Sequence, residues 1–118
     1  FMIQGGDPTG TGRSGPGYTI PDDVVKPLPQ RDYPLNGRTQ RFGYYPKGTV
    51  AMARSGAPNS AGSQFFIMVD DYPLDPSYAI FGHVTEGQDV ADAISQVERD
   101  ELDRPAVDVK MTSVTIEP

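Results

Sequence analysis

The sequence predicts one mainly β domain, a barrel or sandwich, over residues 1–118. Apolar stretches separated by turn residues predict about six short strands. Only one segment has the spacing of an amphipathic helix. A chain of 118 residues buries enough surface for one core but not for two domains, so a single domain is expected.

The N-terminal third predicts one strand followed by long loops. A short apolar run at 1–4 is stopped by the string Gly-Gly-Asp-Pro at 5–8, which predicts a strand that ends in a turn. Residues 9–18 hold four glycines without periodicity and predict a loop. Five prolines between residues 19 and 47 exclude a long helix and predict that any strand there is short.

The middle of the chain contains the strongest predicted strand. Residues 63–69 are mostly apolar, and side chains along a strand alternate between its two faces. Gln64, Phe66 and Met68 are therefore expected on one face. Further strands are expected at 49–54 and 78–84, with loops at 55–62 and 70–77.

One amphipathic helix is expected after Gly87. Its apolar residues follow the i, i+3, i+4, i+7 spacing of a helix face that packs on a sheet: Val90, Ala93, Ile94 and Val97. Asp89 and Asp92 lie near the N-terminal end of this helix, where the helix dipole favours negative charge.

The C-terminal segment predicts a last strand with a bulge. Its apolar residues alternate in two phases, first Val107, Val109 and Met111, then Val114 and Ile116. A bulge near residues 112–113 would keep both halves facing the core.

Composition excludes several classes of chemistry. The net charge is −6 and the basic residues are scattered, which argues against nucleic-acid binding. No apolar run has the length of a membrane helix. With no cysteine and a single histidine, His83, the chain lacks the parts of a thiolate metal site or a Ser-His-Asp triad. We therefore expect no metal and no cofactor, whereas the cellular location stays open.

Without further information, the aromatic and amide residues of the strands also have structural interpretations. Phe65, Phe66 and Phe81 would be core residues in almost any β domain. Gln64 could equally be a buried amide that bonds to neighbouring backbone. A structural β domain of this kind would have no apolar pocket beside Gln4, Gln64 and Phe66.

Three motifs distinguish this chain from a generic β domain. They are the Phe-Met-Ile-Gln-Gly-Gly-Asp string at 1–7, the Gly-Thr-Gly string at 10–12, and the stretch 52–67 that ends in Gly-Ser-Gln-Phe-Phe-Ile. Together with Leu74, Tyr78 and the Phe-Gly pair at 81–82, they resemble the cyclophilin family of peptidyl-prolyl cis-trans isomerases. The match covers nearly the whole chain and is interrupted mainly between residues 21 and 47.

The resemblance implies a fold that is larger than this chain. Cyclophilins are closed antiparallel eight-stranded barrels capped by two helices, and residues 1–118 would supply the later strands and the second helix. We therefore expect an N-terminally incomplete domain. Its leading strands and first helix would lie in a preceding portion.

The resemblance also implies the residues of a proline site. Those expected to bind substrate are Phe1, Met2, Gln4, Ala53, Arg54, Gln64, Phe66, Leu74 and Tyr78. Gln4 and Gln64 would supply amide hydrogen bonds, the backbone at Ala53 and Arg54 would bind the residue before proline, and Gln4, Gln64 and Phe1 are the expected catalytic residues. Regular alternation places Phe1 and Met2 on opposite faces, so a twist or bulge is expected if both reach the pocket.

Four departures from the family pattern concern this site. The family's catalytic arginine would lie a few residues before Phe1, outside this chain. Pro73 stands where an aromatic residue is frequent, and Tyr78 stands where histidine is frequent at the pocket rim. Arg54 replaces a frequent asparagine.

The resemblance implies a prolyl isomerase that acts on X-Pro bonds of unfolded or extended protein segments. The expected partners are proline-containing polypeptides, with cyclosporin-type ligands as a further class, and the complete protein is expected to be a monomer. A catalytically weak peptide-binding or scaffold module of the same fold is the alternative.

Overall fold

The computed structural model describes residues 1–23 and 27–118, and these residues are mainly β with one helix, as predicted. The strands are β1 Met2–Gly5, β2 Gln30–Leu35, β3 Arg38–Tyr45, β4 Thr49–Met52, β5 Phe65–Met68, β6 Tyr72–Pro73 and β7 Ile80–His83. The helix is α1, Gln88–Ile94. The strands predicted at 1–4, 49–54, 63–69 and 78–84 are confirmed within one or two residues at most ends.

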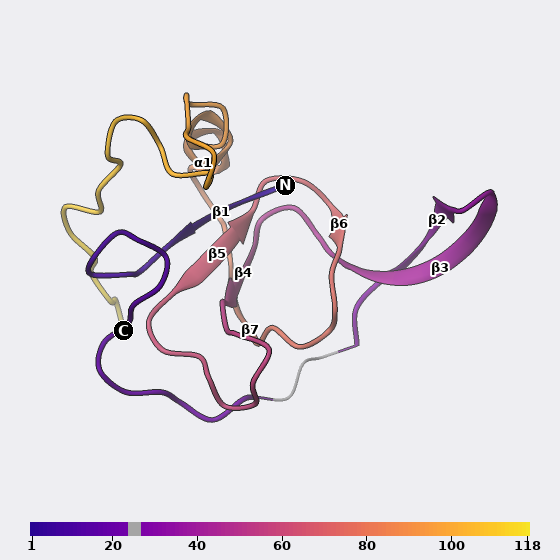
Figure 1. The fold of residues 1–118 in the computed structure, drawn as a ribbon, viewed down its shortest axis with the longest axis horizontal. Coiled ribbons are helices and arrows are strands. Elements are labelled where there is room, and N and C mark those ends of the chain that lie inside the picture. The colour runs from indigo at the N-terminus through magenta and orange to yellow at the C-terminus, as the bar shows by residue number, and fades with distance from the viewer. Residues whose placement is uncertain (24–26) are drawn as a thin grey trace.

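Four strands form an antiparallel sheet in the order β1-β5-β4-β7 (Figure 1). Strand β5 lies inside this sheet and pairs with β1 on one side and β4 on the other. Phe66 of β5 is therefore opposite Gln4 of β1 and opposite Ala51 of β4. This register brings residues that are far apart in the sequence to one place on the sheet.

A second sheet contains β2, β3 and β6 in that order. Its β2–β3 hairpin extends away from the rest of the chain (Figure 1). Asn36 and Gly37 form its two-residue turn with φ of 51° and 74°, the positive values that suit the twist of a hairpin. Strand β3 is eight residues long. The prediction that any strand between residues 19 and 47 is short is therefore wrong for the second half of that segment. The reason is that the run from 35 to 45 contains no proline.

The expected closed eight-stranded barrel is not formed by the described residues, which make two separate sheets. The prediction of a C-terminal strand at 107–116 is wrong. The structure has no strand there, and Ile116 is 89% exposed. Alternation provides a strand with an apolar face, but the strand forms only if another strand pairs with its backbone. The segment 70–77, which the sequence predicts to be a loop, contains the two-residue strand β6. Its residues Tyr72 and Pro73 pair with β3.

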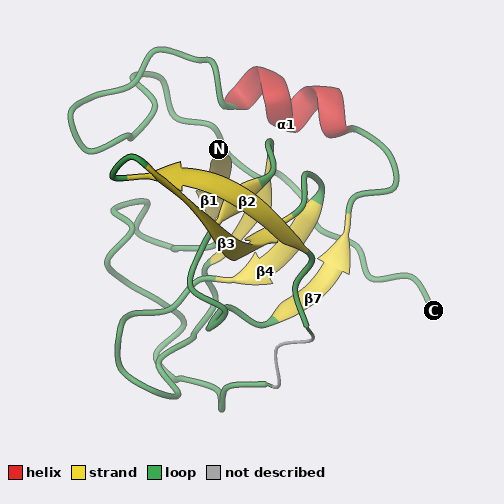
Figure 2. Ribbon diagram, turned by 90° about the vertical axis from the view of Figure 1, so that its right-hand side faces the viewer, coloured by secondary structure: helices red, strands yellow, loops and turns green. Residues whose placement is uncertain are grey.

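Helix α1 lies to one side of the strands (Figure 2). The predicted apolar face is wrong for Val90, Ala93 and Val97, which are exposed. Ile94 of the same face is half-buried, and Ala91 is the buried residue of the helix. The contacts of the inner face are partly polar: Gln88 Nε2 donates to the carbonyl of Met68 over 3.1 Å. The helix is too short and too polar to cross a membrane, and none of the described residues form one that could.

The core lies where the two sheets meet. Its fully or almost fully buried members are Tyr45, Ala51, Phe66 and Met68. Phe66 and Met68 are buried on one face of β5, in agreement with the predicted alternation, while Phe65 and Ile67 are only half-buried. Partly buried residues pack around this cluster, namely Met2, Leu28, Ala53, Leu74 and Tyr78.

Candidate functional site

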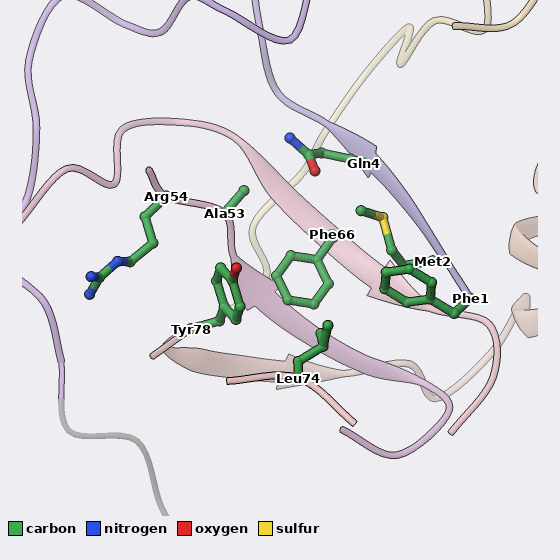
Figure 3. Close-up of a pocket in the computed structure, with 8 residues that line it drawn as sticks. All are labelled: Phe1, Met2, Gln4, Ala53, Arg54, Phe66, Leu74 and Tyr78. Carbon is green, nitrogen blue, oxygen red and sulfur yellow. The ribbon is translucent and has the colours of Figure 1, made fainter. Parts of the chain in front are cut away.

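A pocket of about 140 Å³ opens over the core cluster (Figure 3). Its lining residues are Phe1, Met2, Gln4, Ala53, Arg54, Phe66, Leu74 and Tyr78. These are eight of the nine residues that the resemblance implies for substrate binding. They come from β1 and the residue before it, from β5, from the segments that follow β4 and β6, and from the segment before β7. The pocket contradicts the interpretation as a β domain without an apolar cavity.

Phe1 and Met2 both line this pocket, although regular alternation would separate them. No bulge is needed, because β1 begins at Met2 and pairs in regular register with β5. Phe1 precedes the strand and is free of its alternation. Its ring stacks on Tyr72, with the ring centres 4.1 Å apart and the planes within 12°.

Two aromatic rings that line the pocket, Phe66 and Tyr78, pack against each other and against the buried ring of Tyr45. Phe66 meets Tyr78 edge to face, with ring centres 5.4 Å apart, and Tyr45 packs 6.1 Å from each of them. The Tyr45 hydroxyl donates to the carbonyl of Tyr78 and accepts from its N–H. Burial raises the pKa of Tyr45.

Tyr45 is not among the site residues that the sequence predicts. Its position in the chain lies between 21 and 47, where the family resemblance is interrupted. The available signal was weak, an aromatic residue at the end of the proline-free run. Its role depends on long-range contacts with β5 and with Tyr78, which no local pattern shows.

The two glutamines form a hydrogen-bonded pair. Gln4 Nε2 donates to Gln64 Oε1 over 2.8 Å, and Gln64 Nε2 donates to the carbonyl of Ser14 over 2.7 Å. Only Gln4 lines the pocket, so Gln64 contacts it through Gln4. This differs from the expectation that both amides border the pocket directly.

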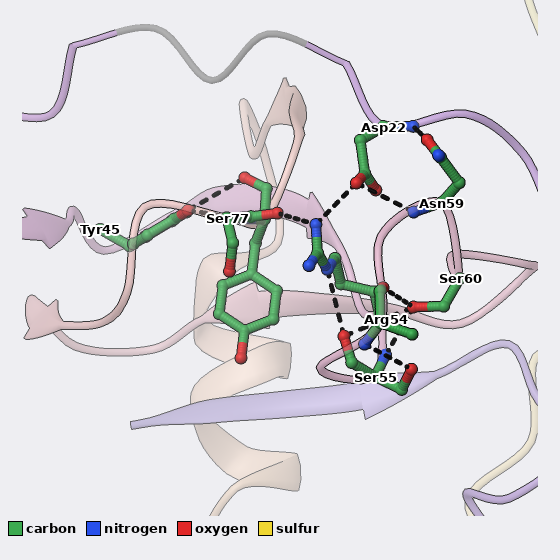
Figure 4. A network of polar contacts seen from close by, with 9 residues as sticks. Asp22, Tyr45, Arg54, Ser55, Asn59, Ser60 and Ser77 are labelled. Atoms are coloured by element: carbon green, nitrogen blue, oxygen red, sulfur yellow. Dashed lines mark hydrogen bonds and ion pairs between the residues drawn. The ribbon is translucent and has the colours of Figure 1, made fainter.

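Arg54 lines the pocket. It also belongs to a network of polar contacts (Figure 4). Its guanidinium forms an ion pair with Asp22 at 2.8 Å, and the Arg54 side chain is only 14% exposed. Asp22 also accepts from the N–H of Asn59, while Asn59 Oδ1 accepts from the N–H of Asp22. These contacts join the segment before residue 24 to the turn after β4.

The backbone N–H of Ala53 already has a hydrogen-bond partner within the chain. This N–H donates to the carbonyl of Gln64 over 3.0 Å. The pocket therefore combines apolar side chains with a few amide groups. No cluster of three or more histidines, cysteines and carboxylates that could hold a metal occurs in residues 1–23 and 27–118.

The family model of cyclophilin type peptidyl-prolyl cis-trans isomerases matches residues 1–116. The chain belongs to this family. The resemblance of its motifs is thus confirmed, together with the likeness to the relatives described next.

Curated relatives of this cyclophilin-type chain carry isomerase names. The probable peptidyl-prolyl cis-trans isomerase A of Mycobacterium leprae is 46% identical over 98% of the chain. The peptidyl-prolyl cis-trans isomerase A of Mycobacterium tuberculosis is 45% identical over the same share. The chain spans 57% of the length of each of these relatives.

A solved structure supports the fold. The chain resembles a cyclophilin type peptidyl-prolyl cis-trans isomerase of Cryptosporidium parvum, crystallised in the presence of the dipeptide Ala-Pro. The TM-score is 0.67 at 34% identity, over 90% of this chain and 61% of that one.

Proposed function

We propose that the protein accelerates cis-trans isomerisation of X-Pro peptide bonds in unfolded or extended protein segments and thereby assists folding. The observation that carries this proposal is the pocket over Phe66, which has the size and apolar lining for a small ring and an amide beside it. Membership of the cyclophilin family and the names of the relatives support it. The reaction requires no cofactor.

The chemistry of the reaction suits such a pocket. The barrier to rotation about a peptide bond, about 18–20 kcal/mol, comes from amide resonance, which the twisted transition state loses. A catalyst therefore only has to bind the twisted state more tightly than the planar one. A preference of about 4 kcal/mol gives roughly a thousandfold acceleration.

Each part of the pocket has a proposed role. Met2, Phe66 and Leu74 would hold the proline ring, with Phe1 and Tyr78 at the edge. The Gln4 amide, which Gln64 orients, would bond to the peptide backbone around the rotating bond. The carbonyl of Ala53 and the backbone of Arg54 would hold the residue before proline.

We also propose that the working domain contains residues before Phe1. They would supply the leading strands and first helix that close the barrel, and the catalytic arginine of the family. Three observations support this: the relatives are longer than this chain, β1 and β7 are edge strands, and Phe81 is 60% exposed. Phe81 borders an apolar cavity of about 500 Å³ next to β7, where such strands could pack.

A binding module that turns over poorly is the second candidate. It is favoured by the state of Arg54, which lines the pocket and whose guanidinium is already paired with Asp22. The proposed ligands are the same, proline-containing polypeptides and cyclosporin-type compounds. In either case we propose a monomer that does not bind nucleic acid.

The test is an isomerisation assay on a short X-Pro peptide. It compares the 118-residue chain alone with the chain preceded by the additional N-terminal residues of the Mycobacterium leprae relative. Activity in the extended protein that is lost in its Phe66→Ala variant supports the enzyme. Peptide binding without acceleration in both proteins supports the binding module, and absence of both refutes the proline site.

A further inference from the structure

Asp7 holds together the loop that follows β1. Its carboxylate accepts four backbone N–H groups, those of Thr9 (2.8 Å), Thr11 (3.1 Å), Arg13 (3.1 Å) and Ser14 (3.2 Å). It also accepts the hydroxyls of Thr9 (2.9 Å) and Thr11 (3.1 Å). A single charged side chain thus determines the path of residues 9–14, a glycine-containing stretch without regular structure.

The same loop contacts the glutamine pair through Ser14. The Ser14 N–H donates to Asp7, and the Ser14 carbonyl accepts from Gln64 Nε2 over 2.7 Å. Gln64 Oε1 in turn accepts from Gln4 Nε2 over 2.8 Å, and Gln4 lines the pocket. A continuous series of hydrogen bonds therefore runs from Asp7 to the pocket.

This series of hydrogen bonds determines the orientation of both side-chain amides, that is, the direction of the NH₂ group and of the oxygen of Gln4 and Gln64. A carbonyl oxygen can only accept, so Ser14 selects the NH₂ end of the Gln64 amide. The Gln64 oxygen then faces Gln4 and selects the NH₂ end of the Gln4 amide. If Ser14 moved, either amide could rotate and present the opposite group.

We propose that Asp7 is a positioning residue for the pocket, which acts through Ser14 and Gln64 to orient the amide of Gln4. The orientation of the amides follows from the contacts of this chain. Its effect on catalysis rests on the proposed prolyl isomerase function. Asp7 itself does not line the pocket.

The first experiment measures the amides directly and needs no enzymatic activity. The side-chain NH₂ resonances of Gln4 and Gln64 are recorded by NMR in the 118-residue chain and in its Asp7→Asn variant. In the parent, both pairs should differ from those of free glutamine, and in Asp7→Asn they should move toward the free values. Unchanged Gln64 resonances in a folded Asp7→Asn variant would overturn the proposal.

Two controls accompany the NMR measurement. Asp32→Asn also removes one exposed carboxylate, but its partner is Arg41 on the β2–β3 hairpin, so the glutamine resonances should stay in place. Thr11→Val removes one hydroxyl donor and keeps the Asp7 charge. If Asp7→Asn does not fold, Thr11→Val decides. A movement of the Gln64 NH₂ resonances from their parent positions toward the free values supports the proposal, and unchanged resonances contradict it.

A kinetic cycle tests the consequence in the extended protein described above. Asp7→Asn should lower kcat/KM about tenfold in the parent background and leave it almost unchanged in a Gln64→Ala background. Independent, additive losses would mean that Asp7 acts only on stability. If the parent does not accelerate isomerisation, the proposed function fails and the NMR result alone decides the role of Asp7.

Discussion

The hydroxyl of Tyr45 bonds to both backbone groups of Tyr78. It donates to the Tyr78 carbonyl over 3.0 Å and accepts from the Tyr78 N–H over 3.1 Å. Tyr45 has no exposed surface, and Tyr78 lines the pocket. One buried oxygen atom of the core therefore holds both backbone groups of a residue at the pocket rim, in addition to the ring contacts of Tyr78.

Replacement of Tyr45 by phenylalanine should weaken both fold and pocket. The Tyr78 N–H and carbonyl would lose their partner in a part-buried site, which costs about 1–3 kcal/mol in the free energy of unfolding. Urea denaturation of Tyr45→Phe should show this loss, together with weaker binding of an Ala-Pro peptide. Tyr18→Phe removes a hydroxyl from a ring that is 66% exposed and should change neither quantity.

Phe66→Ala should be among the most destabilising substitutions in the chain. The side chain is 3% exposed and packs against Tyr45 and Tyr78. Removal of a buried phenylalanine costs about 3–5 kcal/mol and would also open the floor of the pocket. The control is Leu102→Ala, because Leu102 is 78% exposed and its truncation should leave the denaturation midpoint in place. Equal midpoints for both variants would contradict the assignment of Phe66 to the core.

Gly6 cannot carry a side chain without rearrangement. Its φ is +93°, and a Cβ there would lie 2.2 Å from the carbonyl oxygen of Ser63. Gly6→Ala should therefore cost at least about 2 kcal/mol of stability, whereas Gly12→Ala should cost about 1 kcal/mol because only its φ of +77° opposes alanine. Gly56→Ala has open space and no positive φ, and should be close to neutral in the same thermal unfolding series.

The contribution of Asp7 to stability should depend on pH in one direction. Desolvation raises its pKa, but hydrogen bonds from Thr9, Ser14 and Thr11 outweigh that effect and hold the pKa well below the ordinary value. A lowered pKa in the folded state means stability that is present above the unfolded pKa, about 3.9, and is lost as the pH falls below it. The parent should be more stable than Asp7→Asn at pH 7. This difference in the free energy of unfolding should decrease progressively as the pH falls below about 4.

Equilibrium unfolding of both proteins across this pH range checks the prediction. Because Asp71 and Asp92 also have lowered pKa values, the parent curve alone contains several contributions, and only the difference from Asp7→Asn isolates that of Asp7. A difference that is constant with pH would show that the charge of Asp7 is not what stabilises the loop.

Much of the site was accessible from the sequence because its residues lie within short motifs. The strings at 1–7 and 62–67 contain Gln4 and Phe66, and strand alternation correctly placed Phe66 with Met68 on the buried face. Tyr45 and Asp22 were missed, since both act through partners more than 30 residues away in the sequence. Local patterns carry no information about such contacts.

The sequence by itself determined where strands can form, where prolines and glycines interrupt them and which side chains share a face. These properties depend on the backbone and on neighbouring residues within a few positions. Only the tertiary structure decided which strands pair, that Val90 faces away from the sheet while Ala91 is buried, and that residues 107–118 form no strand. The physical reason is that pairing and burial require a partner surface, and the position of that surface depends on the whole chain.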